Sequence, residues 1–111
     1  MENNNFFNNL KSTYIIAEIG VNHNGQIAVA KKLIDSAIDC GANAVKFQSY
    51  KSSLLASPST PKVKYQLKSS IDKRETHLQM LERYEITKDN HYELNNYCRN
   101  RNIDFLSTPY D

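Results

Sequence analysis

The chain has 111 residues, of which 40% are hydrophobic and 23% charged, and its formal net charge is +2 at pH 7. A chain of this length forms one domain at most and buries about two thirds of its unfolded surface on folding. The small net charge argues against a dedicated nucleic-acid surface. The sequence shows neither a basic stretch leading into an apolar one nor a long apolar span, so we expect a cytoplasmic protein.

The first expected element is a strand at residues 14–17, an apolar run without strict alternation, as in strands covered on both faces. Glu18 stands at its end. An unpaired buried carboxylate is costly, so we expect Glu18 to have either a partner or a function. In the turn that follows, Asn22, Asn24 and Gly25 suit an ordinary surface turn equally well, and His23 is a candidate for contacting a ligand.

Residues 26–40 carry apolar side chains at helical spacing, and Gly41 follows as a suitable C-terminal cap. The next segment, AVKFQSY at residues 44–50, is expected to form a second strand. In a strand, residues two apart point to the same side, so Lys46 and Gln48 share one side and their apolar neighbours share the other.

A second helix is expected at residues 88–101, after a Thr87 cap and with His91 on its surface or boundary, and it leads into a third strand in FLSTPYD at residues 105–111. Residues 49–86, between the second strand and this second helix, look like an insertion whose later part forms a short helix facing the core. Cys40 and Cys98 have no CxxC spacing, so we expect two buried, reduced thiols.

The order of these elements is strand, helix, strand, helix, strand. Crossovers of this length predict parallel strands, whose carboxyl ends meet at one edge of the sheet. The polar residues that follow or end the three strands should therefore converge at that edge. These residues are Glu18, Lys46, Gln48, Ser107 and Thr108.

Five motifs in order carry a resemblance to a known family: IIAEIGVNHNG, AKKLIDSAIDCGANAVKFQSYK, PKVKYQ, HLQMLERYEI and FLSTPYD. Together they resemble the amino-terminal part of the N-acetylneuraminate (sialic acid) synthase family, which includes legionaminic acid synthases. The resemblance covers residues 14–111 and leaves residues 1–13 as a flexible lead-in. It implies an α/β fold, the first three strands of a (β/α)8 TIM barrel with outer helices and an active site at the carboxyl ends of the strands.

The family condenses phosphoenolpyruvate with an N-acetylated hexose, of the N-acetylmannosamine type, to form a nonulosonic acid and phosphate. The resemblance further implies a homodimer with a divalent manganese or magnesium ion, whose ligands in the family fall mostly beyond Asp111. It places Glu18 beside the metal and substrate as the catalytic carboxylate, Lys46 on phosphoenolpyruvate and Gln48 on the sugar. Ser107 and Thr108 would line the phosphoenolpyruvate pocket. His23, Tyr65 and Tyr110 are further candidates, and Tyr110 stands where the family usually has Phe.

Three strands cannot close an eight-stranded barrel, so the chain alone is expected to be inactive, either as a truncated reading frame or as a piece of a complete enzyme. Three alternatives stay open. The chain could derive from a legionaminic or pseudaminic acid synthase, or it could be a noncatalytic fragment that associates through its open sheet edge. A doubly wound phosphate-binding domain is disfavoured, because GVNHNG lacks the GxGxxG spacing.

Overall fold

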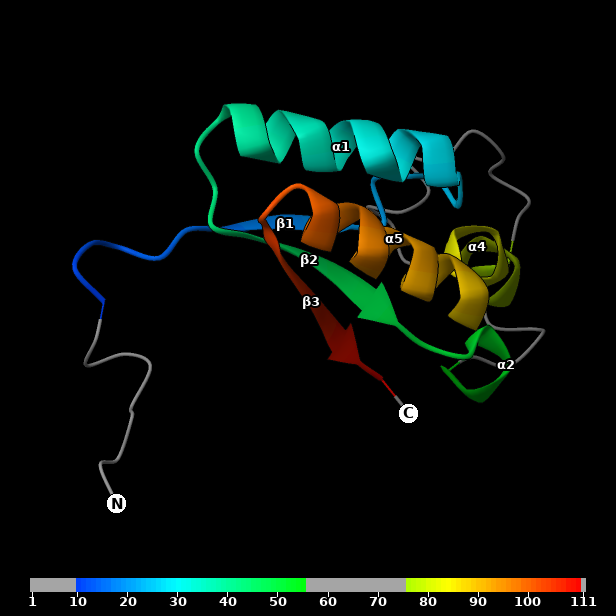
Figure 1. Cartoon of the computed structure of the whole chain (residues 1–111). Helices are drawn as coiled ribbons and strands as arrows, with labels where there is room; N and C mark the ends of the chain where they lie inside the picture. Colours follow the sequence, from blue (N-terminus) through cyan, green and yellow to red (C-terminus); the bar gives the residue numbers. More distant parts are fainter. Residues whose placement is uncertain (1–9, 56–75, 111) are drawn as a thin grey trace, which may run out of the picture.

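The computed structural model describes residues 10–55 and 76–110 (Figure 1). The described elements are β1 (Ile16–Gly20), α1 (Ile27–Asp39), β2 (Ala44–Ser49), α2 (Ser52–Leu55), α4 (His77–Tyr84), α5 (Lys88–Asn100) and β3 (Asp104–Pro109). Most of the expected lead-in, the loop with Tyr65 and the terminal Asp111 lie outside the described residues.

The strands form one parallel sheet in the order β1-β2-β3, as the crossovers predicted. Glu18 pairs in register with Lys46, which in turn pairs with Leu106, and Gln48 pairs with Thr108. The expected parallel arrangement, with a helix in each of the two long connections, is confirmed. Both long helices, α1 and α5, pack against the same face of the sheet (Figure 1).

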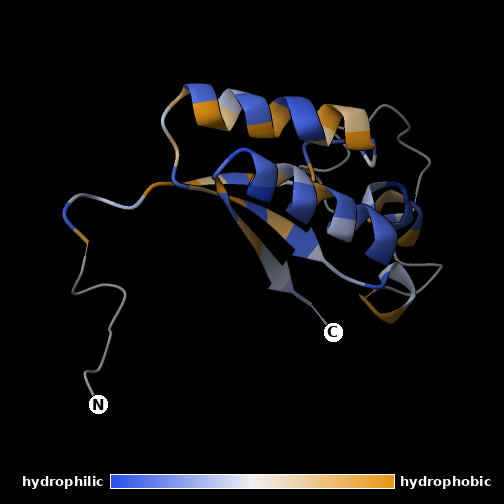
Figure 2. Ribbon diagram, in the orientation of Figure 1, coloured by the Kyte–Doolittle hydropathy of each residue, from blue (hydrophilic) through white to orange (hydrophobic). Residues whose placement is uncertain are grey.

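The hydrophobic core lies between the sheet and these two helices. Ala30, Ile34 and Ala37 recur at helical spacing on α1, and Leu94 and Cys98 do the same on α5. They meet the alternate strand residues that point toward the helices, namely Ile19, Val45 and Phe47, with Phe105 packed against the same cluster. Figure 2 shows α1 with hydrophobic and hydrophilic residues along its length, whereas α5 is mostly hydrophilic. Each helix therefore buries one stripe and leaves the rest to solvent.

Local signals explain where the helices begin. The Thr76 side chain accepts a hydrogen bond from the Gln79 backbone N–H, and the Gln79 side chain accepts one from the Thr76 N–H, which makes a capping box for α4. Thr87 caps α5 as expected, accepting a hydrogen bond from the Asn90 N–H at 3.2 Å.

None of the described helices has the length and apolarity needed to span a lipid bilayer.

Two expectations about the first strand were wrong. The strand begins at Ile16, because β2 begins at Ala44 and its first residue pairs with Ile16. Ile15 instead accepts hydrogen bonds from the backbone N–H groups of Asn43 and Ala44 through its carbonyl oxygen. The strand also continues to Gly20, so Glu18 lies within it rather than at its end.

Two further expectations concerned burial. Cys98 is buried as expected, but Cys40 is exposed, because it is the residue that ends α1 and lies beyond the stripe facing the sheet. The short helix α4 exists where it was expected, but none of its residues is fully buried. It packs against α2 and the loop after β2 instead of entering the main core.

Candidate functional site

The sheet face that α1 and α5 leave open carries the polar side chains of Glu18, Lys46, Gln48 and Thr108, with Asp104 on the same side where β3 begins. Strand residues alternate between faces, and the intervening residues Ile19, Val45 and Phe47 belong to the core on the other side. The expectation that the first four side chains share one side of a parallel sheet is confirmed, with Gln48 and Thr108 toward the carboxyl ends of their strands and Glu18 and Lys46 nearer the middle. Together these four present a carboxylate, an ammonium group, an amide and a hydroxyl.

The centre of this open face is an ion pair. Lys46 Nζ lies 2.9 Å from Glu18 Oε2, and the two side chains are 36% and 50% exposed. The carboxylate thus has the partner that the sequence required, although it is not buried, because the described residues place nothing over this face. Charges this accessible keep most of their hydration and remain available to a polar ligand.

Gly20 leaves room beside the ion pair. Its φ of +56° is a conformation that L side chains rarely adopt, and it lies at the irregularity where β1 shifts register against β2. A Cβ added there would stand 3.5 Å from Glu18 Oε1 and 3.7 Å from Gln48 Nε2. The carboxylate and the amide therefore flank a backbone position without a side chain, which the sequence analysis did not single out.

Ser107 does not lie on the open face, contrary to the expected convergence of five residues. It is adjacent to Thr108 in the same strand, so the two side chains point to opposite sides of the sheet. Its hydroxyl oxygen lies 2.5 Å from Ser49 Oγ, which lies 3.0 Å from His91 Nε2 on α5. The alternation that paired Lys46 with Gln48 could also have separated Ser107 from Thr108.

His23 is buried, at 1% exposed, and its ring lies 6.0 Å from that of Phe47. The backbone N–H of Gly25 donates to His23 Nδ1 at 2.9 Å. Burial lowers the pKa of His23, a hydrogen bond with the Gly20 backbone opposes that shift, and the nearby His91 adds to it. These contacts hold His23 within the turn after β1, and its expected contact with a ligand stays a prediction.

Tyr110 lies at the rim of a cavity of about 540 Å³ beside β3 and α5, which is also lined by Tyr92, Phe105 and Ser107. Its side chain is half exposed, and its backbone N–H donates to the Ser49 carbonyl at 2.9 Å. Tyr110 therefore accompanies Ser107 on the helix-covered side, and its expected contact with a ligand stays a prediction.

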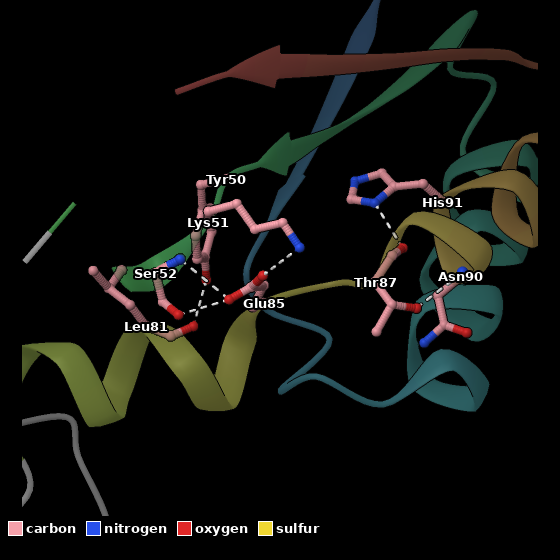
Figure 3. A network of polar contacts seen from close by, with 8 residues as sticks. All are labelled: Tyr50, Lys51, Ser52, Leu81, Glu85, Thr87, Asn90 and His91. Atoms are coloured by element: carbon pink, nitrogen blue, oxygen red, sulfur yellow. Dashed lines mark hydrogen bonds and ion pairs between the residues drawn. The ribbon is translucent and has the colours of Figure 1, made fainter. Parts of the chain in front are cut away.

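The loop after β2 is held by Glu85, which follows α4 (Figure 3). Its carboxylate accepts hydrogen bonds from the Ser52 backbone N–H at 3.1 Å and Ser52 Oγ at 2.6 Å, and Lys51 Nζ lies 3.7 Å away. Burial alone would raise the pKa of Glu85, but the bonds from Ser52 and the charge of Lys51 lower it on balance. Nothing local in the sequence marks this contact, because its partners are 33 residues apart.

The divalent metal implied by the resemblance does not find a donor set in the described part of the chain. No group of three or more His, Cys, Asp or Glu side chains there is arranged to hold a metal ion. Of the carboxylates on the open face, Glu18 is paired with Lys46, and Asp104, where β3 begins, accepts a hydrogen bond from the Tyr14 hydroxyl.

A parallel sheet with helices packed on one side is the arrangement that a segment of a (β/α)8 barrel has. Residues 33–111 match the model of the NeuB family, and the chain belongs to that family.

Relatives with curated names agree with this assignment. The chain is 48% identical over 102 residues to an N,N'-diacetyllegionaminic acid synthase of Campylobacter jejuni, a match covering 92% of this chain and 30% of the relative. It is 40% identical to the Legionella pneumophila protein of the same name, with 88% of this chain and 27% of the relative covered.

A solved structure shows the same fold. The N-acetylneuraminic acid synthetase of Leptospira borgpetersenii, crystallised in complex with citrate, matches 91% of this chain and 30% of its own with a TM-score of 0.67 and 31% identity. The chain thus spans 27 to 30% of the length of these three proteins.

Proposed function

We propose that this chain forms the phosphoenolpyruvate- and sugar-binding part of a nonulosonic acid synthase. The proposal depends mainly on one observation: Glu18, Lys46, Gln48 and Thr108 share one face of a parallel sheet whose strands β2 and β3 lie within the residues that match the NeuB family. The reaction joins phosphoenolpyruvate to an N-acetylated hexose and releases phosphate.

Each side chain has chemistry suited to a part of this reaction. The ammonium group of Lys46 binds an anionic phosphate or carboxylate, and a charge-assisted hydrogen bond of this kind contributes about 1.5 to 3 kcal/mol. Lys46 has three N–H donors, so it can keep Glu18 and still bind the anion. Thr108 offers a hydroxyl to the same anion, and the amide of Gln48 can both donate to and accept from sugar hydroxyls.

The bond changes in the proposed reaction balance as follows. The methylene carbon of phosphoenolpyruvate forms a bond to the aldehyde carbon, and the aldehyde oxygen takes up a proton. Water then adds to the former enol carbon, the bond from that carbon to the phosphate oxygen breaks, and the added oxygen becomes a carbonyl; of the two protons that the water loses, one in net terms goes to the former aldehyde oxygen and one to the phosphate. Glu18 is the acid–base or electrostatic group next to the reacting aldehyde.

Manganese or magnesium would polarise the aldehyde oxygen when bound. Among the described residues, Glu18 would be the carboxylate nearest the proposed substrate site, and the remaining ligands would have to come from elsewhere. The complete enzyme is proposed to be a homodimer.

The sugar is proposed to be of the legionaminic type. The identities to the two legionaminic acid synthases, 48% and 40%, exceed the 37% to the N-acetylneuraminate-9-phosphate synthase of Drosophila melanogaster over a similar share of the chain. The match to a pseudaminic acid synthase, at 46%, covers only 40% of the chain. An N-acetylmannosamine-type sugar is the second candidate.

A hybrid enzyme tests the proposal, since this chain covers about 30% of its relatives. The matched segment of the Campylobacter jejuni synthase is replaced by the corresponding residues of this chain, and phosphate release from phosphoenolpyruvate is measured. The sugars offered are N-acetylmannosamine and the hexose precursor of N,N'-diacetyllegionaminic acid. A folded hybrid that releases no phosphate with either sugar, beside an active parent, would contradict the proposed function.

Two substitutions in the hybrid separate binding from chemistry. Lys46→Ala should raise KM for phosphoenolpyruvate about 10-fold or more, because it removes a charge that binds the anion in ground and transition states alike. Glu18→Gln should lower kcat about 100-fold with a smaller change in KM. Lys32→Ala, on the exposed side of α1, is the matched control. A fully active Glu18→Gln enzyme would return Glu18 to a purely structural role.

A further inference from the structure

A chain of hydrogen bonds runs directly behind the open face. Ser107 Oγ lies 2.5 Å from Ser49 Oγ, and Ser49 Oγ lies 3.0 Å from His91 Nε2. His91 Nδ1 lies 3.1 Å from the carbonyl oxygen of Thr87, the residue that caps α5 (Figure 3). These hydrogen bonds therefore link the carboxyl ends of β2 and β3 to the first turn of α5.

The partners determine the direction of these bonds. The Thr87 carbonyl can only accept, so His91 Nδ1 carries a proton, and in the neutral ring Nε2 is then an acceptor. Ser49 donates its hydroxyl proton to Nε2, and its oxygen accepts the hydroxyl proton of Ser107. The ring of His91 is further held edge-on to Phe105, with the ring centroids 6.4 Å apart. One arrangement of donors and acceptors thus accounts for all the hydrogen bonds from Ser107 to Thr87.

Ser49 and Ser107 are next in sequence to two of the candidate binding residues. Ser49 follows Gln48, and Ser107 precedes Thr108, while Gln48 and Thr108 are themselves paired in register. The Tyr110 N–H donates to the Ser49 carbonyl at 2.9 Å, one more bond between the two strand ends. A hydroxyl held on one face of a strand end restricts the backbone from which the next side chain leaves on the other face.

We propose that Ser107, Ser49 and His91 are positioning residues for Gln48 and Thr108. This inference rests on the proposed function, because it concerns how that site holds its substrates. Small apolar residues could fill the same space, whereas hydrogen-bonded side chains impose a defined geometry. Misplacing a binding group by about 1 Å can cost an enzyme about 100-fold in rate, so strand ends that bind substrate benefit from such a restraint.

The kinetic test uses the hybrid enzyme with Ser107→Ala, Ser107→Thr and, as matched control, Ser36→Ala. The Ser36 hydroxyl donates to the Lys32 carbonyl on α1, so its loss removes a hydroxyl far from the site. Ser107→Ala should raise KM for phosphoenolpyruvate and for the sugar about 10-fold with a smaller change in kcat, since Thr108 and Gln48 contact ground and transition states alike. Ser107→Thr keeps the hydroxyl and should restore KM, and Ser36→Ala should leave it unchanged.

A second pair of variants covers the case in which Ser107→Ala does not fold. His91→Gln retains an amide near the Nε2 position and should approach the parent KM, whereas His91→Leu should raise it as Ser107→Ala does. His77→Leu, on α4, is the control, because it replaces a histidine that takes no part in these hydrogen bonds. Unchanged KM values in both Ser107→Ala and His91→Leu would overturn the proposal.

Hydrogen exchange measured by mass spectrometry gives a readout that does not depend on activity. Ser107→Ala should speed amide exchange in residues 104–110 and leave β1 unchanged, and Ser107→Thr should reverse the effect. Unaltered exchange in Ser107→Ala would overturn the positioning role even in an inactive hybrid. An unmodified hybrid without activity would instead count against the proposed function, so the two failures are distinguishable.

Discussion

The two faces of the sheet differ in burial and in chemistry. On the covered face, Val45 and Phe47 are fully buried beneath α1 and α5. On the open face, one residue away in the same strands, Lys46 and Glu18 form an exposed ion pair. The comparison shows that successive residues of one strand can serve stability and chemistry separately. Variants of the two faces should therefore have different consequences for folding.

The largest expected effect comes from the covered face. Phe47→Ala removes a buried ring that stacks on Phe105 with centroids 5.4 Å apart, so it should destabilise the chain by about 3 to 5 kcal/mol. Leu106→Ala, on the open face and 36% exposed, is the matched control and should cost less than about 1 kcal/mol. Urea unfolding followed by circular dichroism measures both. Equal losses would mean that the open face is packed as tightly as the covered one.

A smaller, pH-dependent effect should come from His23, whose pKa is lowered mainly by burial. Below the ordinary histidine pKa of about 6.5, His23 is protonated in the unfolded chain, whereas in the folded chain its lowered pKa keeps it neutral to a lower pH. This contribution to stability is complete above that pH and decreases as the pH falls below it. His23→Asn keeps an acceptor for the Gly25 N–H but does not titrate, so its Tm should fall less between pH 7.5 and pH 5.5.

His77→Asn is the control for this titration, because it removes a histidine from α4 and leaves the buried ring in place. Its melting temperature should follow the parent across the same pH range. If His23→Asn and the parent lost stability equally on acidification, the buried ring would not be the group responsible.

The ion pair of the open face should contribute little to folding. Glu18 and Lys46 are both more than a third exposed, and exposed pairs contribute about 0 to 1 kcal/mol. A double-mutant cycle with Glu18→Gln and Lys46→Met, measured by urea unfolding, should give a coupling energy in that range that decreases with salt. A coupling well above about 2 kcal/mol would make the pair structural and weaken its assignment to substrate binding.

Replacing the exposed Cys40 should have the smallest effect on stability. Cys40 and Cys98 should nevertheless differ greatly in their reactivity. Burial raises the pKa of Cys98 to about 11, against an opposing influence of Arg101, whereas Cys40 is exposed at the end of α1. Iodoacetamide at pH 8 should modify Cys40 quickly and Cys98 only when the chain unfolds. Cys40→Ser should leave the unfolding midpoint unchanged. Equal labelling rates in the folded chain would show that the covered face opens readily.

Much of the fold follows from local pattern. The 3.6-residue repeat of apolar side chains predicted helices at residues 26–40 and 88–101, and the structure has them at Ile27–Asp39 and Lys88–Asn100. The two-residue repeat in β2 correctly placed Lys46 and Gln48 on one side of the sheet. These features depend on neighbours along the chain, so a single sequence contains the information for them.

The particulars of the candidate site depend on contacts between distant residues, and the tertiary structure decided them. The bounds of β1 followed from its register with β2, and the exposure of Glu18 followed from which face the helices cover. The contact of Ser49 with His91 joins residues 42 apart, so no local repeat could indicate it. Sequence by itself determined which residue types alternate along each strand. Packing determined which of them meet, because faces and partners are chosen only when the sheet and helices assemble.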